Sequence, residues 1–298
     1  MGLEIFLYNN MIKMFLYIYL TCTIMINKFI NKQITFIGGG KMTTSMIQNI
    51  LNKNILLPSQ IIVSNRNEKK NSFFQNNLGI KTITNNYDAC LNSDIIMIAV
   101  KPQSLENVMT NIKNIENKLI LSVIAGIPLK TYENNLNSKK IVRIMPNTPT
   151  IIGEGMSVWS SLNLNDTDLS LTKDLLKSFG KEMYVDNENY LDIATAISGT
   201  GPTYLYLLAE SMIDSGVHLG LSRDKAEELV HQTLLGSTKY LIQSNTHPAI
   251  LRNDITSPGG TSAEAIAVLE KNGLRSNLSE AIWAAYHRSV KLGKIHDT

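Results

Sequence analysis

Short apolar segments alternate with amphipathic segments over the first half of the chain, from Gln33 to about Ser160. Strands that are buried on both faces of a parallel sheet are apolar along their whole length, and helices connect them. The pattern therefore predicts a doubly wound α/β sheet. The predicted strands are 34–38, 61–64, 80–83, 94–100, 118–125 and 141–145, and the predicted helices are 42–51, 67–77, 87–92, 104–112 and 128–136.

The pattern changes after a connecting stretch at 163–186, where strand-like segments end and apolar residues recur at the spacing of amphipathic helices. Pro202 is expected to open the first of these helices, which ends near Gly220. Further helices are expected after Ser222 and from about Thr261 and Leu278. The predicted division is a leader at 1–32, an α/β domain at 33–186 and an all-α domain at 187–298.

The leader contains an apolar run from Met14 to Ile26, flanked by Lys13 and Lys28. The run is too short to span a bilayer, and no small-residue cleavage site follows it, as a signal peptide requires. The alternative is a translation start at Met25, which leaves a short polar lead before the first strand. We favour this second interpretation and expect no membrane partner.

Composition excludes several classes of protein. The 298 residues, 44% of them hydrophobic, suffice for a substantial core. The net charge of +3 is small and no long basic run occurs, so we expect no nucleic-acid partner. Cys22 and Cys90 stand far apart, which argues against a disulfide framework and indicates a reducing, cytoplasmic setting. The five histidines never recur at the spacing of metal ligands, so we predict no metal.

A glycine-rich turn, Gly38-Gly39-Gly40-Lys41-Met42, joins the first predicted strand to the first predicted helix. Gly38 permits the tight turn, and Gly40 lets the backbone approach a pyrophosphate at the amino end of the helix. This context predicts a Rossmann-type dinucleotide-binding domain at 33–186. Thr43 stands where the motif has its third glycine, so the helix is expected to pack slightly farther from the strand. The alternative is an ordinary turn without a ligand.

The end of the second predicted strand reads Ser64-Asn65-Arg66, without the carboxylate that binds the ribose hydroxyls of NAD. An arginine suits a 2′-phosphate, so NADPH is predicted and NADH is the alternative; Arg66 is otherwise a solvated loop cation. The turn after the fourth strand would border the nicotinamide ribose. The predicted cofactor contacts are Gly38, Gly40, Lys41, Met42, Ser64, Asn65, Arg66, Asn86, Ala99, Val100, Lys101, Pro102 and Ala125.

A second glycine-containing loop, Ser257-Pro258-Gly259-Gly260, precedes the helix predicted from Thr261. Its glycines leave backbone amides free to converge on an anion, and the hydroxyls of Ser257, Thr261 and Ser262 add neutral donors. A small carboxylate is the natural ligand. The alternative is a capped loop without a ligand, because Thr261 and Glu264 have the spacing of a capping box.

At these residues the chain resembles pyrroline-5-carboxylate reductase, from about Gln33 to Lys291. Five segments match the family in order. They are GGGKM (38–42), AVKP (99–102), RIMPNTP (143–149), SGTGPTY (198–204) and His247-Pro248 leading to SPGG (257–260).

The resemblance implies NAD(P)H-dependent reduction of L-1-pyrroline-5-carboxylate to L-proline, the last step of proline biosynthesis. In the family the SPGG amides hold the substrate carboxylate, and a hydroxyl two residues beyond the glycines binds the ring nitrogen. That position is Ser262 here, where the family usually has threonine, so we expect looser positioning. Asp254 beside the loop would disfavour a carboxylate if its side chain pointed inward. The predicted catalytic residues are Thr261 and Ser262, and the predicted substrate contacts are Ser257, Gly259, Gly260, Thr261, Ser262, Gly199 and Thr200.

The resemblance also implies that the all-α domain pairs with that of a second subunit, and that dimers can assemble further. It places Glu188 near the cofactor, although a solvated surface acid is an equal alternative. Asn147 and Thr148 either face the nicotinamide or form a turn before Pro149. No strong general acid is needed if the imine arrives protonated.

Two other functions remain open from the sequence. A β-hydroxyacid dehydrogenase would share the architecture, but it needs a proton donor such as a lysine on the central helix, and 202–220 contains none. A protein that senses NADPH without turnover would have no use for the SPGG loop.

Overall fold

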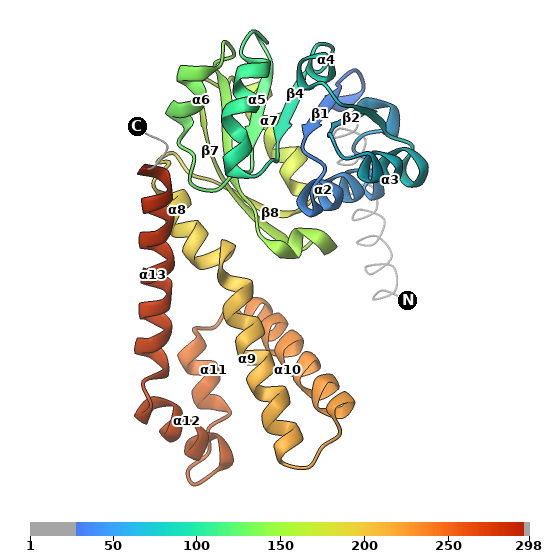
Figure 1. Cartoon of the computed structure of the whole chain (residues 1–298). Coiled ribbons are helices and arrows are strands. Elements are labelled where there is room, and N and C mark those ends of the chain that lie inside the picture. Colours follow the sequence, from blue (N-terminus) through green and yellow to red (C-terminus); the bar gives the residue numbers. More distant parts are fainter. Residues whose placement is uncertain (1–27, 295–298) are drawn as a thin grey trace, which may run out of the picture. The chain divides into compact units, whose positions relative to one another are not determined.

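The computed structural model describes residues 28–294 of the chain (Figure 1). The expectations for the apolar run at 14–26 and for a start at Met25 concern residues outside this range. Contacts divide the chain into two compact units. The first unit runs up to Gly199 and includes the residues from Arg288 onward, and the second unit is Thr200–His287.

The first unit is built on an eight-stranded sheet with the order β3-β2-β1-β4-β5-β6-β7-β8. All neighbouring strands are parallel except β6 and β7, which are antiparallel. The chain order reverses between β1 and β4, the position at which open α/β sheets bind their ligands. The strands are β1 (Ile34–Ile37), β2 (Ile61–Ser64), β3 (Lys81–Ile83), β4 (Ile95–Ile98), β5 (Leu119–Ser122), β6 (Lys140–Met145), β7 (Gly155–Leu162) and β8 (Gly180–Tyr184).

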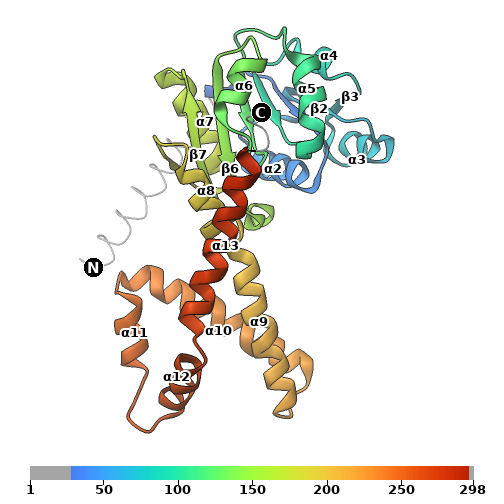
Figure 2. The ribbon, with the colours of Figure 1, turned by 60° about the vertical axis from the view of Figure 1, so that its left-hand side comes forward.

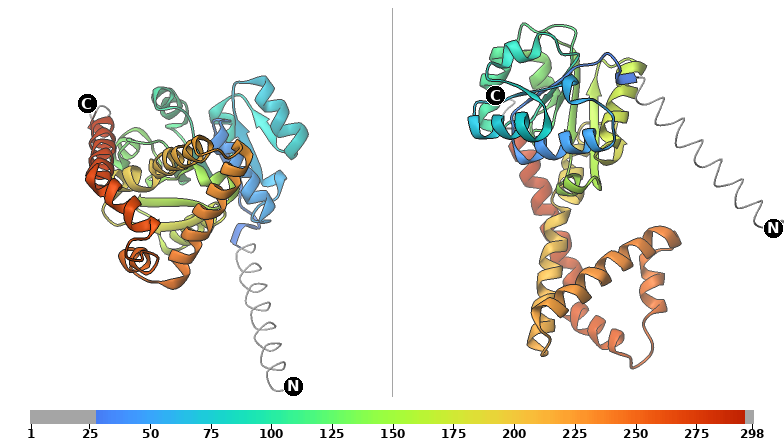
Figure 3. Two further views of the ribbon diagram at one scale, coloured as in Figure 1. Left: turned by 90° about the horizontal axis from the view of Figure 1, so that it is seen from below. Right: turned by 90° about the vertical axis from the view of Figure 1, so that its right-hand side faces the viewer.

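Helices cover both faces of the sheet and enclose two apolar cores (Figures 1 and 3). Successive residues of a strand enter opposite cores, as Phe36 and Ile37 of β1 do. One core is closed by α2 (Lys41–Asn52), α3 (Glu68–Leu78) and α7 (Asp166–Lys177), and the other by α4 (Asn86–Cys90), α5 (Leu105–Ile112) and α6 (Leu129–Asn135). The short helices η1 (Pro58–Gln60), η2 (Pro102–Ser104) and η3 (Thr148–Ile152), then α8 (Tyr190–Ala194) and the π-helix η4 (Thr195–Gly199), complete the unit.

The second unit contains helices alone. Its core is small: Ile213, Ala226 and Val230 are buried where α9 packs on α10. Gly216 permits this close approach, because a Cβ there would lie 3.1 Å from the Cβ of Ala226. The helices are α9 (Gly201–His218), α10 (Arg223–Ser244), α11 (Pro248–Asp254), α12 (Thr261–Lys271) and the larger part of α13 (Leu274–Lys294), the red helix of Figure 2.

The predicted fold class is confirmed: a largely parallel sheet of Rossmann type is followed by helices. The prediction that 163–186 is a connecting stretch is wrong, because α7 and β8 lie within it. Strand β7 was also missed, since Ser157 and Ser160 interrupt its apolar character although both are buried. Strand β8 lies at the sheet edge and is largely exposed, so its sequence carries no buried pattern.

The contacts divide the chain after Gly199, later than the boundary at 186 that the sequence indicated. Helix α8 packs on β6 and β7 and buries Leu191 completely, which keeps this segment with the sheet. Helix α11 was not predicted, and α13 begins at Leu274 rather than near Leu278. The capping box at Thr261 is also wrong: Gly260 is the N-cap of α12 and Thr261 is already helical.

Candidate functional site

The glycine turn after β1 has no room for a side chain at Gly38 and open space at Gly40. Gly38 has φ +103°, and a Cβ there would lie 2.6 Å from the carbonyl oxygen of Ala99. Gly40 has nothing within 4 Å of a Cβ position, so the backbone at this residue borders open space at the amino end of α2. Thr43 is fully buried and its hydroxyl donates to the Gly38 carbonyl at 2.7 Å. The residue in place of the third glycine therefore closes the turn with a hydrogen bond.

A cavity of about 350 Å³ lies at the carboxyl ends of β1 and β2. Ser64 donates to the Asn86 side-chain oxygen at 2.7 Å, which fixes both residues at its wall. Arg66 is exposed, and its side chain forms no hydrogen bond or ion pair with other residues of 28–294. Its guanidinium is therefore available to an anion. Six predicted cofactor contacts line this cavity: Gly38, Ser64, Asn65, Arg66, Asn86 and Val100.

Other predicted cofactor contacts lie outside that cavity. Gly40 and Lys41 line a separate cavity of about 520 Å³, together with Phe73 and Ile151. Helix α2 continues from Lys41 through the predicted contact Met42. Ala99 follows β4 and its amide donates to the Ile37 carbonyl at 2.9 Å, so the turn at 99–102 is held beside β1. Lys101 is the N-cap of η2, which Pro102 opens, and Ala125 lies in the loop after β5.

The SPGG loop belongs to the second unit and ends at the N-cap of α12. Gly259 has φ +69°, and a Cβ on Gly260 would lie 2.5 Å from the hydroxyl oxygen of Ser257. The Gly260 amide donates to the Ser257 carbonyl at 3.0 Å. The backbone amides of Thr261 and Ser262 donate to no acceptor within the described part of the chain. These two donors are therefore available to an anion at the start of an 11-residue helix.

Two polar side chains near the SPGG loop, His247 and Asp254, cap a helix and face solvent, respectively. His247 accepts from the Ala249 amide at 3.2 Å through Nδ1 and caps α11, which explains the His247-Pro248 pair. Asp254 ends α11 and is exposed to solvent. The described residues contain no cluster of three or more His, Cys, Asp or Glu side chains that could bind a metal ion.

The predicted substrate contacts Gly199 and Thr200 fall on either side of the division between the units. Gly199 packs on Met145, whose methyl carbon would lie 2.5 Å from a Cβ at 199. Asn147 donates to the Ser198 carbonyl at 3.1 Å and accepts from the Met156 amide at 2.8 Å. The side-chain amide of Asn147 thus links η4, through its nitrogen, to β7, through its oxygen.

Two family models match most of the chain. One describes pyrroline-5-carboxylate reductase dimerisation and matches residues 188–292; the other describes an NADP oxidoreductase, coenzyme F420-dependent, and matches 33–126. The pyrroline-5-carboxylate reductase of Methanosarcina acetivorans is 36% identical over 268 residues, which cover 89% of this chain and 99% of that protein. The Synechocystis enzyme of the same name is 35% identical, over 88% of this chain and 98% of its own. The chain belongs to the pyrroline-5-carboxylate reductase family.

Solved structures agree with this assignment. The crystal structure of Plasmodium falciparum pyrroline carboxylate reductase with NADP bound has a TM-score of 0.82 and 36% identity, covering 88% of this chain and 98% of that one. Membership of the pyrroline-5-carboxylate reductase family makes the chain an NAD(P)H-dependent oxidoreductase, as the resemblance implied. The match to a dimerisation model also supports homo-oligomers. No helix among residues 28–294 combines the length and apolar character needed to cross a bilayer.

One group of residues in this reductase was not foreseen. Glu188 is not a solvated surface acid, because its carboxylate accepts from Arg143 Nη1 at 2.7 Å and from the Leu129 amide at 2.8 Å. Its place near the cofactor stays a prediction. The signal in the sequence was Arg143 itself, a charged residue inside the apolar run IVRIM, which requires an acidic partner when buried. Its partners lie 45 and 49 residues farther along the chain, so spacing alone does not identify them.

Proposed function

We propose that this chain reduces L-1-pyrroline-5-carboxylate to L-proline with NADPH. The observation that carries the proposal is the pair of uncommitted amides at Thr261 and Ser262, beside a loop whose glycines admit a carboxylate closely. This loop occurs in a chain whose other unit has a glycine turn after β1. A hydroxyacid dehydrogenase or a sensor would not explain the loop.

NADPH supplies the hydride for the imine carbon when it is bound. The residues proposed to hold it are the glycine turn at 38–42, with the α2 amides toward the pyrophosphate, and Ser64, Asn65 and Arg66 toward the 2′-phosphate. The turn at Ala99–Pro102 and Ala125 would border the nicotinamide half, and Asn86 the adenosine half. Arg66 is exposed and distinguishes the 2′-phosphate from a ribose hydroxyl by its charge.

The substrate carboxylate would be held by the amides of Thr261 and Ser262, with the backbone of Gly259 and Gly260 close to it. The Ser262 hydroxyl is proposed to contact the ring nitrogen and so to orient the C=N bond. Hydride addition to the protonated imine yields the neutral amine, so the substrate's own proton stays on nitrogen and no acid of the chain is consumed. The residues act by positioning.

The proposal includes a homodimer formed through the second unit, with dimers assembling into a larger oligomer. Exposed apolar side chains on α9 and α10 support such pairing. A reducing, cytoplasmic setting is also part of the proposal. It rests on the two cysteines of the sequence, Cys22 and Cys90, which stand far apart and show no disulfide spacing.

Ser262→Ala tests the proposal directly. We expect kcat to fall about tenfold, the loss of roughly 1.4 kcal/mol from one hydrogen bond to a charged group, with the NADPH dissociation constant unchanged. Ser262→Thr restores the residue usual in the family and should retain or raise kcat. Ser279→Ala, an exposed serine of α13, is the matched control. Unchanged turnover in Ser262→Ala would remove the assigned role, and absent turnover in the unaltered protein would remove the function.

A further inference from the structure

Arg143 lies within β6, an inner strand of the sheet, and its side chain is only 7% exposed. A buried guanidinium requires anionic partners, because an unpaired charge away from water is strongly unfavourable. The partners are Glu188, whose Oε1 lies 2.7 Å from Nη1, and Asp192, whose Oδ1 lies 3.5 Å from Nη2. Both acids follow β8 and lie before or within α8.

Two neutral donors complete the group. The Ser289 hydroxyl donates to Asp192 Oδ1 at 2.7 Å, and the Leu129 amide donates to Glu188 Oε1 at 2.8 Å. Two carboxylates around one guanidinium leave an excess negative charge, and these donors stabilise it. Ser289 is itself 3% exposed, so its hydrogen bond is shielded from water. We name Arg143, Glu188, Asp192 and Ser289 the Arg143 cluster.

The cluster contacts both segments through which the chain passes between the units. Glu188 and Asp192 lie shortly before Gly199, where the chain leaves the first unit, and Ser289 directly follows Arg288, where it returns. The returning helix is also seated by packing: a Cβ on Gly126 would lie 2.9 Å from the Cβ of Leu292. Every one of these contacts is internal to the first unit.

We propose that Arg143 is a positioning residue: it holds the outgoing segment to β6 through Glu188 and Asp192, and the returning segment indirectly through the hydrogen bond from Ser289 to Asp192, and so limits the movement of both segments during turnover. This inference rests on the proposed function, in which the glycine turn of the first unit and the SPGG loop of the second serve one reaction. Slack at either connection lowers the fraction of time spent in reactive geometry, and small misplacements cost large factors in rate. Binding of NADPH, which needs the first unit alone, is left unchanged.

Ser289→Ala is the mildest test, because it removes one hydrogen bond and leaves the Arg143 ion pairs in place. We expect kcat with pyrroline-5-carboxylate to fall roughly three- to tenfold, and the NADPH dissociation constant to stay within about twofold. Amide hydrogen exchange should quicken in 195–199 and 288–294 more than in β1 or β4. Glu188→Gln, which keeps the shape of the acid but removes its charge, should lower kcat further.

Lys130→Ala is the matched control, since it removes an exposed ion pair with Glu133 on α6 and leaves the Arg143 cluster intact. It should match the unaltered protein in kcat and exchange. A lower melting temperature with unchanged kcat in Ser289→Ala and Glu188→Gln would overturn the inference, because the cluster would then stabilise the fold only. Weakened NADPH binding in step with kcat would overturn it as well. Hydrogen exchange needs no substrate, so failure of the proposed function would be seen separately, as absent turnover in the control.

Discussion

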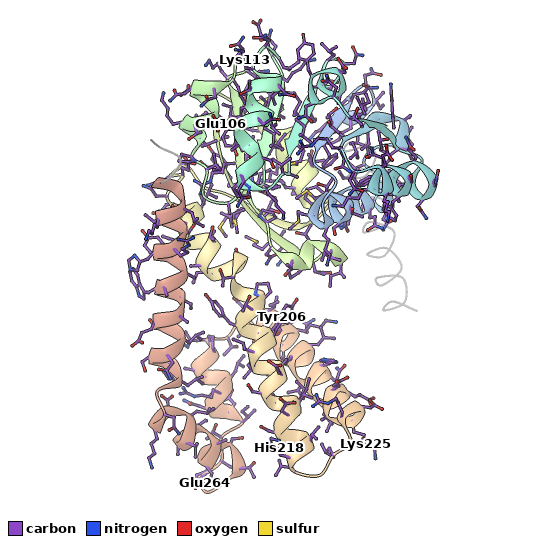
Figure 4. The ribbon with its side chains drawn as sticks, in the orientation of Figure 1. Glu106, Lys113, Tyr206, His218, Lys225 and Glu264 are labelled. Atoms are coloured by element: carbon purple, nitrogen blue, oxygen red, sulfur yellow. The ribbon has the colours of Figure 1, made fainter. Side chains whose placement is uncertain are left out.

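The two units bury their apolar side chains to very different extents. The first unit encloses two cores whose members come from every central strand and from helices on both faces. The second buries three apolar side chains, while Leu205, Tyr206, Leu207 and Leu208, consecutive on α9, are each 47% to 61% exposed. Figure 4 labels Tyr206 among them. The first unit therefore has a core of its own, and the second requires another apolar surface to cover α9.

This difference predicts that substitutions in the two units act on different properties of the protein. In the first unit, the glycines and polar side chains of the cofactor cavities lie on a unit with its own core, so changes there should act on cofactor binding or on the stability of that unit and leave assembly unchanged. In the second unit, apolar side chains are exposed on α9 and α10 and can pack against a second subunit, so changes there should act on assembly. Four substitutions test this contrast, in order of falling effect.

The largest effect is expected from Gly38→Ala. The added Cβ would lie 2.6 Å from a backbone oxygen, at φ +103°. We expect a loss of about 3 kcal/mol in the free energy of unfolding and no measurable NADPH binding. Gly40→Ala is the comparison: its Cβ meets nothing within 4 Å, so stability should hold while NADPH binding weakens about tenfold near the phosphates. Thermal unfolding and fluorescence titration measure both, and equal destabilisation of the two variants would contradict this interpretation.

Leu207→Glu should dissociate the proposed dimer. Burying a carboxylate in an apolar interface costs about 2 to 3 kcal/mol or more, so the dimer dissociation constant should rise at least roughly 30-fold. Sedimentation velocity over a range of concentrations measures the shift. Leu57→Glu, an exposed leucine of the first unit, is the matched control and should sediment as the unaltered protein does. A dimer that persists in Leu207→Glu would place the interface elsewhere.

Arg66→Ala sharpens the account of the first unit. Loss of a charge-assisted contact to the 2′-phosphate is worth about 1.5 kcal/mol, so the NADPH dissociation constant should rise roughly tenfold and that of NADH should not change. Lys239→Ala on α10 removes one positive charge from the second unit and serves as control. An equal rise in the dissociation constants of NADPH and NADH would mean that Arg66 does not recognise the 2′-phosphate.

The smallest effect concerns Asp94, at the opposite ends of the strands. Burial alone would raise its pKa, but the Gln33 amide and the Lys32 ammonium, both at 2.9 Å, hold the pKa below its ordinary value of 3.8. A lowered pKa in the folded state stabilises the protein above that ordinary value, and the gain is lost as the pH falls through the lowered one. Asp94→Asn should therefore be less stable than the unaltered protein at pH 7 and equally stable in strong acid. Urea unfolding from pH 7 downward measures this, with the exposed Asp214→Asn as control.

The sequence predicted best those strands and helices whose hydrophobic pattern follows directly from their burial. Each of the six predicted strands was found within a few residues. Five of them are inner strands, which are mostly apolar because both faces are buried, and β3 is a partly exposed edge strand. Strand β8 lies at the sheet edge, where exposed Lys181 and Met183 show no such pattern. Helix α7 did carry a signal, since Leu171, Leu175 and Leu176 recur at helical spacing after the N-cap Asn165.

The candidate site was predicted where chemistry follows from adjacent residues. The glycine turn and the SPGG loop are local, so their amides and positive φ angles could be inferred from a few letters. The capping box failed because the glycine before Thr261 adopts the extended cap conformation itself. The members of the Arg143 cluster come from β6, from the segment before α8, from α8 and from α13, and only the fold brings them together. The roles of the site residues stay predictions for the assays above.

The packing of Leu292 against Gly126 has a consequence for how the chain is made. A ribosome would release the sheet and all of the second unit before the segment from Arg288 that the first unit also uses. The first unit is thus the first to emerge and the last to complete its packing, and until then Asp192 of the nascent chain lacks the hydrogen bond from Ser289. Stalled or truncated products ending before Ser289 should consequently be better substrates for proteases and chaperones than their length alone would indicate.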